Sequence, residues 1–321
     1  MRFGRVLVEG DPDPVGVVRG EDGRVHSLHR PLAELVAEGL PALLEFGALA
    51  LTTRPWSLDG SRLLAPIVPA SVRDFVAFEE HVVGVRRSVD GASGVPEQWY
   101  AAPTFYFTNP HAIYGPGDEI ARPELCRALD FELEVAAVIG GAGGSSLSEE
   151  QAREAIVGYT IFNDFSARDL QSAEMKVGLG PAKGKDFASS LGPWLVTVDE
   201  LESYRDADGF LDLDCRVEVN GIVVGGDSLA NMGWTFETMV AYASRDSLVL
   251  PGDVLASGTT GGGGCLAELW GRSGTQEPPP LQPGDIVTIT VGGLGSLTNT
   301  IVAGAPVPAL TPFRRATDRR G

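Results

Sequence analysis

The feature that most constrains the fold is a succession of short apolar runs that glycine, proline and aspartate interrupt. Residues 5–10 (RVLVEG) and 15–20 (VGVVRG) are two such runs, and the turn sequence DPDP separates them. Runs of this length between turn signals are typical of β-strands. They do not alternate regularly with helices as in a βαβ repeat, which predicts a mixed α+β fold that is mostly β. Further runs lie at residues 133–140, 194–201, 213–225, 267–271 and 285–295.

The chain divides into unequal parts at a passage that contains two prolines. Residues 1–68 predict a small N-terminal β-rich domain, with a short helix near residues 32–40. The main domain is expected over residues 69–307, and the polar, basic residues 308–321 predict a flexible tail.

Two helices are expected to cover the strands of the main domain. The segment 146–159 contains Ser148 followed three residues later by Gln151, the pattern of a capping box, so a helix should begin at this serine. The segment 232–244 has apolar residues at helical spacing.

Composition excludes several classes of protein. The formal net charge of −18 argues against a nucleic-acid partner, because no basic stripe is available to contact phosphates. No apolar run reaches the roughly 18 residues that a membrane span needs. The first residues contain no apolar stretch of signal-peptide length, so a cytoplasmic protein is expected. The three cysteines, Cys126, Cys215 and Cys265, are too few and too widely spaced for a disulfide framework.

The most informative polar residues are Glu132 and Glu134, which lie two positions apart where an apolar run begins. In a strand they would point to the same side. A Glu-x-Glu pair usually marks a solvated strand face, but the apolar residues that follow indicate a buried strand. Adjacent buried carboxylates repel each other unless a cation neutralises them, and Mg²⁺ and Ca²⁺ prefer oxygen ligands. The pair therefore predicts a metal site.

A second cluster follows the run GYTIFND, which predicts a strand that ends at Asp164. The next residues predict a helical turn, on which Arg168 and Gln171 would share a face. A carboxylate followed by a cation and an amide suits a metal that holds one end of a substrate while fixed donors hold the other. The alternative is a capping aspartate followed by an ordinary polar helix.

Three further residues are candidates for chemistry. Asp74 and His81 would share one stripe if residues 73–85 were helical, although a lone histidine is more often structural than catalytic. Glu268 alternates with apolar residues, so we expect it in a strand as a buried carboxylate, either a base or a paired structural acid. The glycine run 261–264 predicts a flexible lid and does not fit a phosphate loop.

Together these segments resemble the fumarylacetoacetate hydrolase superfamily, and specifically its hydrolase-like branch with a DFxxFxxH motif. The resemblance implies a β-sandwich roll, usually a homodimer, that binds one divalent cation, with Mg²⁺ expected first and Mn²⁺ or Ca²⁺ as alternatives. The motifs occur in order as DFxxFxxH at 74–81, DFELE at 130–134, FNDFSARDLQ at 162–171, LGPAKGKDFASSLGPWLV at 179–196, MGWT at 232–235, LPGDVLASGT at 250–259 and the glutamate of CLAEL at 265–269.

The resemblance also implies roles for individual residues. Glu132, Glu134 and Asp164 match the core metal ligands of the family. Asp74 matches a fourth ligand that shorter members of the family often lack. His81 and Glu268 match the pair that deprotonates water. The groups that stabilise negative charge are matched by Arg168, Gln171 and Lys185.

Tyr106, Ser189 and Thr259 are the predicted substrate contacts. Near them the chain departs from the mammalian-type hydrolase, which has Gly-Thr in place of Ala188-Ser189 and a tyrosine in place of Met175. The chain is also much shorter than that enzyme, so fumarylacetoacetate itself is not assigned as the substrate.

The resemblance implies hydrolysis of a C–C bond in a small β-diketo acid, an acylpyruvate or a fumarylacetoacetate-like molecule, through a metal-bound enolate. A decarboxylase or isomerase of 2-hydroxy-2,4-dienoates or oxo-diacids in aromatic catabolism is the alternative, and it needs no attacking water. An inactive metal-binding homologue is a further alternative, against which the retained carboxylates and Lys185 argue. Without the resemblance, an acidic sugar-binding sandwich would remain, but it would not require convergent carboxylates.

Overall fold

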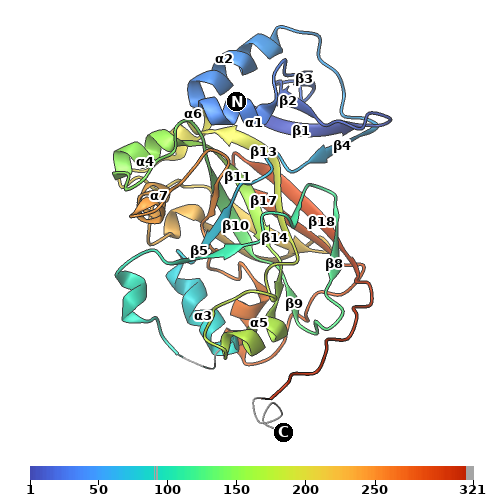
Figure 1. The fold of residues 1–321 in the computed structure, drawn as a ribbon, viewed down its shortest axis with the longest axis vertical. Helices are drawn as coiled ribbons and strands as arrows, with labels where there is room; N and C mark the ends of the chain where they lie inside the picture. The colour runs from blue at the N-terminus through green and yellow to red at the C-terminus, as the bar shows by residue number, and fades with distance from the viewer. Residues whose placement is uncertain (90, 92, 316–321) are drawn as a thin grey trace.

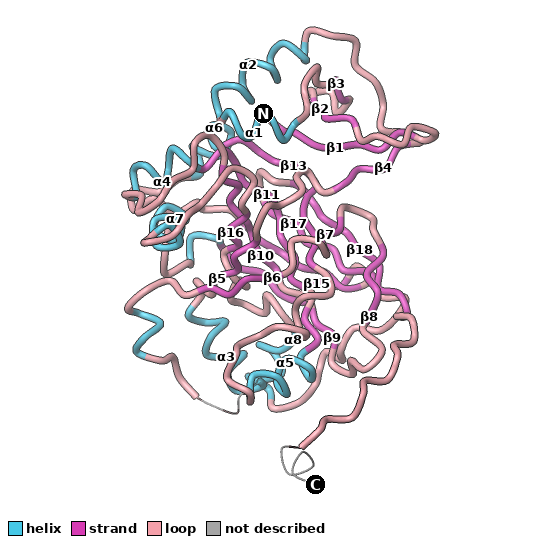
Figure 2. The backbone as a smooth tube through the Cα atoms, viewed as in Figure 1, coloured by secondary structure: helices cyan, strands magenta, loops and turns pink. Residues whose placement is uncertain are grey.

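The centre of the protein is a large mixed β-sheet that the N-terminal strands extend at one side. The computed structural model describes residues 1–89, 91 and 93–315. Figure 2 shows the strands at the centre, with helices around them. The order across the sheet is β3 (Val25–Ser27), β2 (Val15–Arg19), β1 (Arg2–Val8), β13 (Ser189–Thr197), β11 (Ile156–Asp164), β10 (Leu133–Ile139), β16 (Val254–Ala256), β5 (Val72–Phe75) and β6 (Phe105–Thr108), while β4 (Ser61–Leu64) pairs with β1 and β7 (Ile113–Tyr114) pairs with β13.

A five-stranded sheet packs against one face of the large sheet and completes the sandwich. Alternate residues of β10, such as Val135 and Ala137, belong to the apolar cluster that also contains Val217 and Ile289 of this second sheet. A short β-pair lies apart from both sheets. The second sheet has the order β15 (Ile222–Ser228), β14 (Asp214–Val219), β17 (Ile286–Val291), β18 (Gly295–Ala303) and β8 (Glu119–Arg122), and the short pair is β9 (Leu129–Asp130) with β12 (Ser166–Ala167).

Helices cover the other face and the ends of the sandwich. The remaining residues of β10, Ala136 and Val138, belong to a second apolar cluster with Leu35 and Val36 of the N-terminal helices. In Figure 1 the N-terminal unit lies at the top, and the helices near the candidate site lie at the opposite end. The helices are α1 (Leu32–Glu38), α2 (Leu40–Leu51), α3 (Glu79–Val89), α4 (Glu149–Ala155), α5 (Arg168–Met175), α6 (Val198–Leu201), α7 (Phe236–Ser244) and α8 (Leu266–Ser273), with short 3₁₀ turns at Glu97–Tyr100, Glu202–Tyr204 and Leu229–Asn231.

The predicted mixed, mostly β fold is confirmed, and so is the capping box at Ser148, whose side chain accepts a hydrogen bond from the amide of Gln151. The separate domain over residues 1–68 stays a prediction, because β1 continues the large sheet by pairing with β13. Residues 308–315 form no helix or strand, and residues 316–321 of the predicted tail lie outside the described part. No helix in the described ranges has both the length and the hydropathy that a bilayer span requires.

Three local predictions were wrong. Residues 267–271, predicted as a strand, belong to α8, because short apolar runs do not distinguish a strand from a buried helix. Residues 73–85 are not one helix, since Asp74 lies in β5 and His81 in α3. The glycine run 261–264 is mostly buried and bonded to neighbouring backbone, as between the amide of Gly226 and the carbonyl of Gly262 (3.2 Å), so it is not an exposed lid.

One buried ion pair fixes the strand that carries Asp74. The guanidinium of Arg73 in β5 lies 2.9 Å from the carboxylate of Asp253, which directly precedes β16. The same guanidinium donates to the carbonyl of Leu248, and Ser71 donates to the other oxygen of Asp253. Because both charged groups are almost fully buried, each depends on the other for its partner.

We predict that Asp253→Ala lowers the free energy of unfolding by about 3–5 kcal/mol, because it leaves the Arg73 charge buried without its partner. Urea denaturation measures this change. Arg62→Ala is the control, since it removes an ion pair with Asp118 in which Arg62 is 58% exposed, and we expect a change of about 1 kcal/mol or less. Equal effects of the two variants would contradict the role given to the buried pair.

Candidate metal centre and active site

Carboxylates from neighbouring strands meet at one end of the large sheet. Strand β11 ends with Asp164, the antiparallel β10 begins just after Glu132, and β5 holds Asp74 opposite Ala256 of β16. One oxygen from each of Asp74, Glu132 and Asp164 lies within 4.8 Å of the others, and all three side chains are buried. The strand register therefore brings together three residues that are far apart in the sequence.

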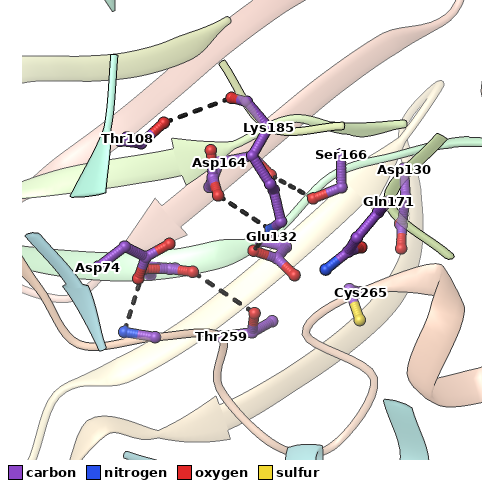
Figure 3. A network of polar contacts seen from close by, with 12 residues as sticks. Asp74, Thr108, Asp130, Glu132, Asp164, Ser166, Gln171, Lys185, Thr259 and Cys265 are labelled. Carbon is purple, nitrogen blue, oxygen red and sulfur yellow. Dashed lines mark hydrogen bonds and ion pairs between the residues drawn. The ribbon is translucent and has the colours of Figure 1, made fainter. Parts of the chain in front are cut away.

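Glu134 is buried beside this group but is not one of the three closest carboxylates. It lies in β10, and its two oxygens accept hydrogen bonds from the amide of Gly258 (3.1 Å) and the hydroxyl of Thr259 (3.4 Å). Figure 3 shows Thr259 below the carboxylates of Asp74 and Glu132. Of the three core ligands predicted from the sequence, the structure thus brings Glu132 and Asp164 together with Asp74, and holds Glu134 next to them.

Two buried cations contact the carboxylates. Lys185, in the loop before β13, places its ammonium 2.5 Å from Glu132 and 2.9 Å from Asp164 (Figure 3). Arg168, the first residue of α5, places a guanidinium nitrogen 2.7 Å from the other oxygen of Glu132 and donates to Gln171 (3.1 Å). Arg168 and Gln171 share one face of α5, as predicted.

The electrostatics of this cluster differ from one carboxyl group to the next. Burial, together with the nearby charge of Asp164, raises the pKa of Asp74 well above its usual value. Burial, together with the charges of Asp74 and Glu132, does the same to the pKa of Glu134. Burial alone would also raise the pKa of Glu132, but the charges of Lys185 and Arg168 outweigh it and hold that pKa below its usual value. The positive charge of Lys185 therefore only partly offsets the repulsion that Asp74 and Glu134 experience.

The cluster has the composition of a site for a hard divalent cation. Oδ1 of Asp74 is buried, and no described residue donates a hydrogen bond to it. The hydroxyl of Tyr106 lies within hydrogen-bond distance of the other oxygen of Asp74 (2.8 Å) and of Asp164, and its single proton can be donated to either. Carboxylate oxygens can accept more than one partner, so Glu132 and Asp164 keep capacity for a cation beside their bonds to Lys185. A divalent cation with oxygen ligands fits this donor set.

A histidine and a glutamate from different helices form a buried pair next to the cluster. Nδ1 of His81 in α3 lies 3.7 Å from Oε2 of Glu268 in α8. The two helices cross closely at glycines. A Cβ atom on Gly84 would lie 2.4 Å from the Cγ of Glu268, and one on Gly271 would lie 1.9 Å from the carbonyl oxygen of Gly84. Both positions therefore require glycine, and this crossing is what brings His81 to Glu268.

A pocket of about 300 Å³ opens onto these groups. The charged residues that line it, such as Lys185 and Arg168, are all buried. Half-buried apolar side chains, including Val76, Val85 and Met175, line its more exposed part. The pocket thus presents charge at its floor and an apolar wall near its mouth.

The predicted substrate contacts occupy different positions around this pocket. Tyr106 and Thr259 line it. Ser189 does not line it, because its buried hydroxyl donates instead to Asp164 (3.0 Å). Ser189 is thus placed to orient a carboxylate rather than to contact a substrate.

Two residues of the site were not assigned a role from the sequence. Asp130 accepts hydrogen bonds from Arg168 (2.8 Å) and from the first amides of α8, at Leu266 (2.8 Å) and Ala267 (2.9 Å). Cys265 caps α8, and its sulfur lies 3.7 Å from Nδ1 of His81. An acid at a helix N-terminus stabilises the helix. This role of Asp130 could not be predicted, because residues 267–271 were expected to form a strand rather than α8.

Comparison with known proteins agrees with this geometry. A family profile described as fumarylacetoacetate (FAA) hydrolase C-terminal matches residues 70–302. This range is more than half of the chain and includes every residue of the cluster, the His81–Glu268 pair and the pocket. The chain therefore belongs to the fumarylacetoacetate hydrolase family.

Relatives within the family carry names of more than one activity. The mitochondrial oxaloacetate tautomerase of Xenopus laevis is 31% identical over 94% of this chain and 90% of its own length. The structure of a 5-carboxymethyl-2-hydroxymuconate delta-isomerase from Mycobacterium smegmatis is 30% identical, with a TM-score of 0.68 over 95% of this chain and 100% of that one. A fumarylacetoacetate hydrolase from Exiguobacterium antarcticum is 27% identical, with a TM-score of 0.73 over 94% and 99%. Family membership alone therefore does not choose the reaction.

We predict that Gly84→Ala lowers the free energy of unfolding by roughly 1–3 kcal/mol, because the added methyl group must push α8 away from α3. Thermal or urea denaturation measures the loss. Ser88→Ala, on an exposed position of the same helix, is the matched control and should change stability much less. An unchanged stability of Gly84→Ala would mean that the helices do not cross as closely as described.

Proposed function

We propose that the protein is a divalent-metal-dependent hydrolase that cleaves the C–C bond of a small β-diketo acid, an acylpyruvate or a fumarylacetoacetate-like molecule. The observation that carries this proposal is the buried His81–Glu268 pair, whose histidine lines a pocket that Arg168 and Lys185 also line. A histidine base held in place by a carboxylate, as His81 is by Glu268, is an arrangement that can activate water. A reaction that only moves protons within the substrate would use a base but no activated water.

The residues that would hold the metal are Asp74, Glu132 and Asp164, with Glu134 beside them. The unpartnered oxygen of Asp74 and the excess of buried carboxylates support this assignment. When bound, a cation such as Mg²⁺ acts as a Lewis acid that polarises substrate oxygens and orients the oxo-acid. The choice among Mg²⁺, Mn²⁺ and Ca²⁺ and the expected homodimer stay predictions.

The protein side chains can carry out the proton transfers. With Nδ1 of His81 directed at Glu268, the other ring nitrogen takes a proton from water, whose oxygen bonds to the carbonyl carbon at the acyl end. The C–C bond then breaks, and its electron pair stays on the departing enolate. Arg168 and Lys185 supply positive potential in a buried setting where this negative charge develops. His81 returns its proton to the enolate carbon, which gives two acids.

A second candidate is an isomerase, tautomerase or decarboxylase acting on 2-hydroxy-2,4-dienoates or oxo-diacids. The relatives named as a delta-isomerase and an oxaloacetate tautomerase, at 30% and 31% identity, favour it. Such reactions use the same stabilisation of an enolate but no attacking water. The two candidates therefore differ in what His81 contributes.

A substrate screen tests the proposal. Acylpyruvates and dienoate diacids are offered with Mg²⁺ or Mn²⁺, while the diketo absorbance, enol–keto conversion and CO₂ release are followed. The apolar mouth of the pocket, with Val76, Val85 and Met175, favours an uncharged acyl end over a second carboxylate. Cleavage of acylpyruvates supports the hydrolase, whereas enol–keto conversion or CO₂ release without cleavage supports the second candidate.

We predict that His81→Ala lowers the rate of hydrolysis by about 100-fold or more, because it removes the general base, while enol–keto conversion of the same substrate persists. Steady-state kinetics on the best acylpyruvate from the screen measure both rates. His111→Ala, at an exposed histidine, is the matched control. Unchanged hydrolysis in His81→Ala would remove this histidine from the mechanism.

We predict that Asp74→Asn weakens the binding of Mn²⁺ by about 10-fold or more, because it removes a charged ligand. The same change should leave the metal-free protein at least as stable, since it relieves repulsion with Asp164. Isothermal titration and thermal denaturation measure the two effects. Asp199→Asn, at an exposed site, is the control. Unchanged Mn²⁺ affinity in Asp74→Asn would contradict the assignment of this ligand.

A further inference from the structure

The two oxygens of the Glu268 carboxylate have different surroundings. Oε1 accepts a hydrogen bond from the amide of Gly263 (3.0 Å) and lies 2.6 Å from a guanidinium nitrogen of Arg272. Oε2 is buried and accepts no hydrogen bond from any residue in the described ranges, and it is the oxygen that faces Nδ1 of His81. One oxygen is therefore anchored by two donors, while the other remains directed at the histidine.

Arg272 reaches this buried carboxylate from the protein surface. It lies one helical turn after Glu268 in α8, and its side chain is 39% exposed. The same guanidinium nitrogen also pairs with Glu80, the residue that precedes His81 in α3. Arg272 therefore links the helix that carries the histidine to the helix that carries the glutamate, without touching the pocket of the candidate active site.

We propose that Arg272 is a positioning residue that holds the Glu268 carboxylate in the orientation that serves His81. The terminal torsion of a glutamate is broad, so a single donor does not define the plane of the carboxylate. Two donors from different directions on Oε1 do define it, and they leave Oε2 free for the imidazole. The proposal rests on the function proposed above, in which Glu268 orients the base.

Neighbouring groups do not replace this contribution. The sulfur of Cys265 also lies 3.7 Å from Nδ1 of His81, but a thiol is a weak hydrogen-bonding partner. The amide of Gly263 stays in place when Arg272 is changed, yet it supplies neither charge nor a second direction. Without Arg272 the carboxylate can rotate toward other donors, and the imidazole loses a defined partner.

The kinetic test compares Arg272→Met with Arg272→Lys and with Arg216→Met. Arg216 is a half-exposed arginine in a surface ion pair with Glu218 on the second sheet, and it serves as the matched control. We expect Arg272→Met to lower kcat for hydrolysis by about 10-fold with little change in KM, and Arg272→Lys to recover much of the loss. Arg216→Met should behave like the unchanged protein. An unaltered kcat in Arg272→Met would overturn the proposal.

A double-mutant cycle separates positioning from a general structural effect. In a His81→Ala background, Arg272→Met should change the residual rate by less than about 2-fold, because the base that it serves is absent. A loss of the same size in both backgrounds would show that Arg272 acts on something other than His81, and would overturn the proposal.

A spectroscopic test does not depend on activity. The chain has four histidines, so the ¹⁵N imidazole signals of His81 can be assigned by their absence in His81→Ala. At fixed pH, with Mg²⁺ present, we expect His81 to carry its proton on Nδ1 in the unchanged protein and to become a mixture of tautomers in Arg272→Met. Identical tautomers in both would overturn the proposal. If no substrate is hydrolysed, the proposed function fails, while this comparison still decides the role of Arg272.

Discussion

Mutual repulsion among buried carboxylates is the constraint on which the rest of the structure depends. Asp74, Glu132, Glu134 and Asp164 are each at most 4% exposed, and they converge where water cannot screen their charges. Lys185 and Arg168 offset part of this charge at Glu132. The remaining excess lies on the Asp74 side. A fold that kept such an arrangement without a cation would have to protonate some of these acids.

The surrounding structure serves to hold these charged groups in place. The register of β10, β11 and β5 brings the acids to one end of the sheet, and the buried Arg73–Asp253 pair fixes the edge near Asp74. Asp130 joins Arg168 to the N-terminus of α8, so the guanidinium and the helix that carries Glu268 share one anchor. A change at this anchor would move both halves of the site together.

The site thus has two parts that perform different tasks. The carboxylates at the end of the sheet suit binding and polarising an oxo-acid, a task common to the reactions named for this chain's relatives. The His81–Glu268 pair is built from two helices that cross at glycines, and in the proposed function it activates water.

Much of the fold and site could be predicted from the sequence. The apolar runs located most central strands, residue parity placed Glu132 and Glu134 on one side of their strand, and the family resemblance grouped them with Asp164. The helix α8 was not predicted, because its run of apolar residues is short and the acid that accepts hydrogen bonds from its first amides, Asp130, lies 136 residues before Leu266 in the chain. The same error hid Arg272, whose relation to Glu268 exists only in a helix. Close helix crossings and partners distant in sequence leave no local pattern.

Anomalous diffraction from crystals grown with Mn²⁺ shows whether the buried carboxylates form a metal site. We expect one strong anomalous peak among Asp74, Glu132 and Asp164. Absence of that peak at saturating Mn²⁺, or a peak only beside His81 and Cys265, would contradict it.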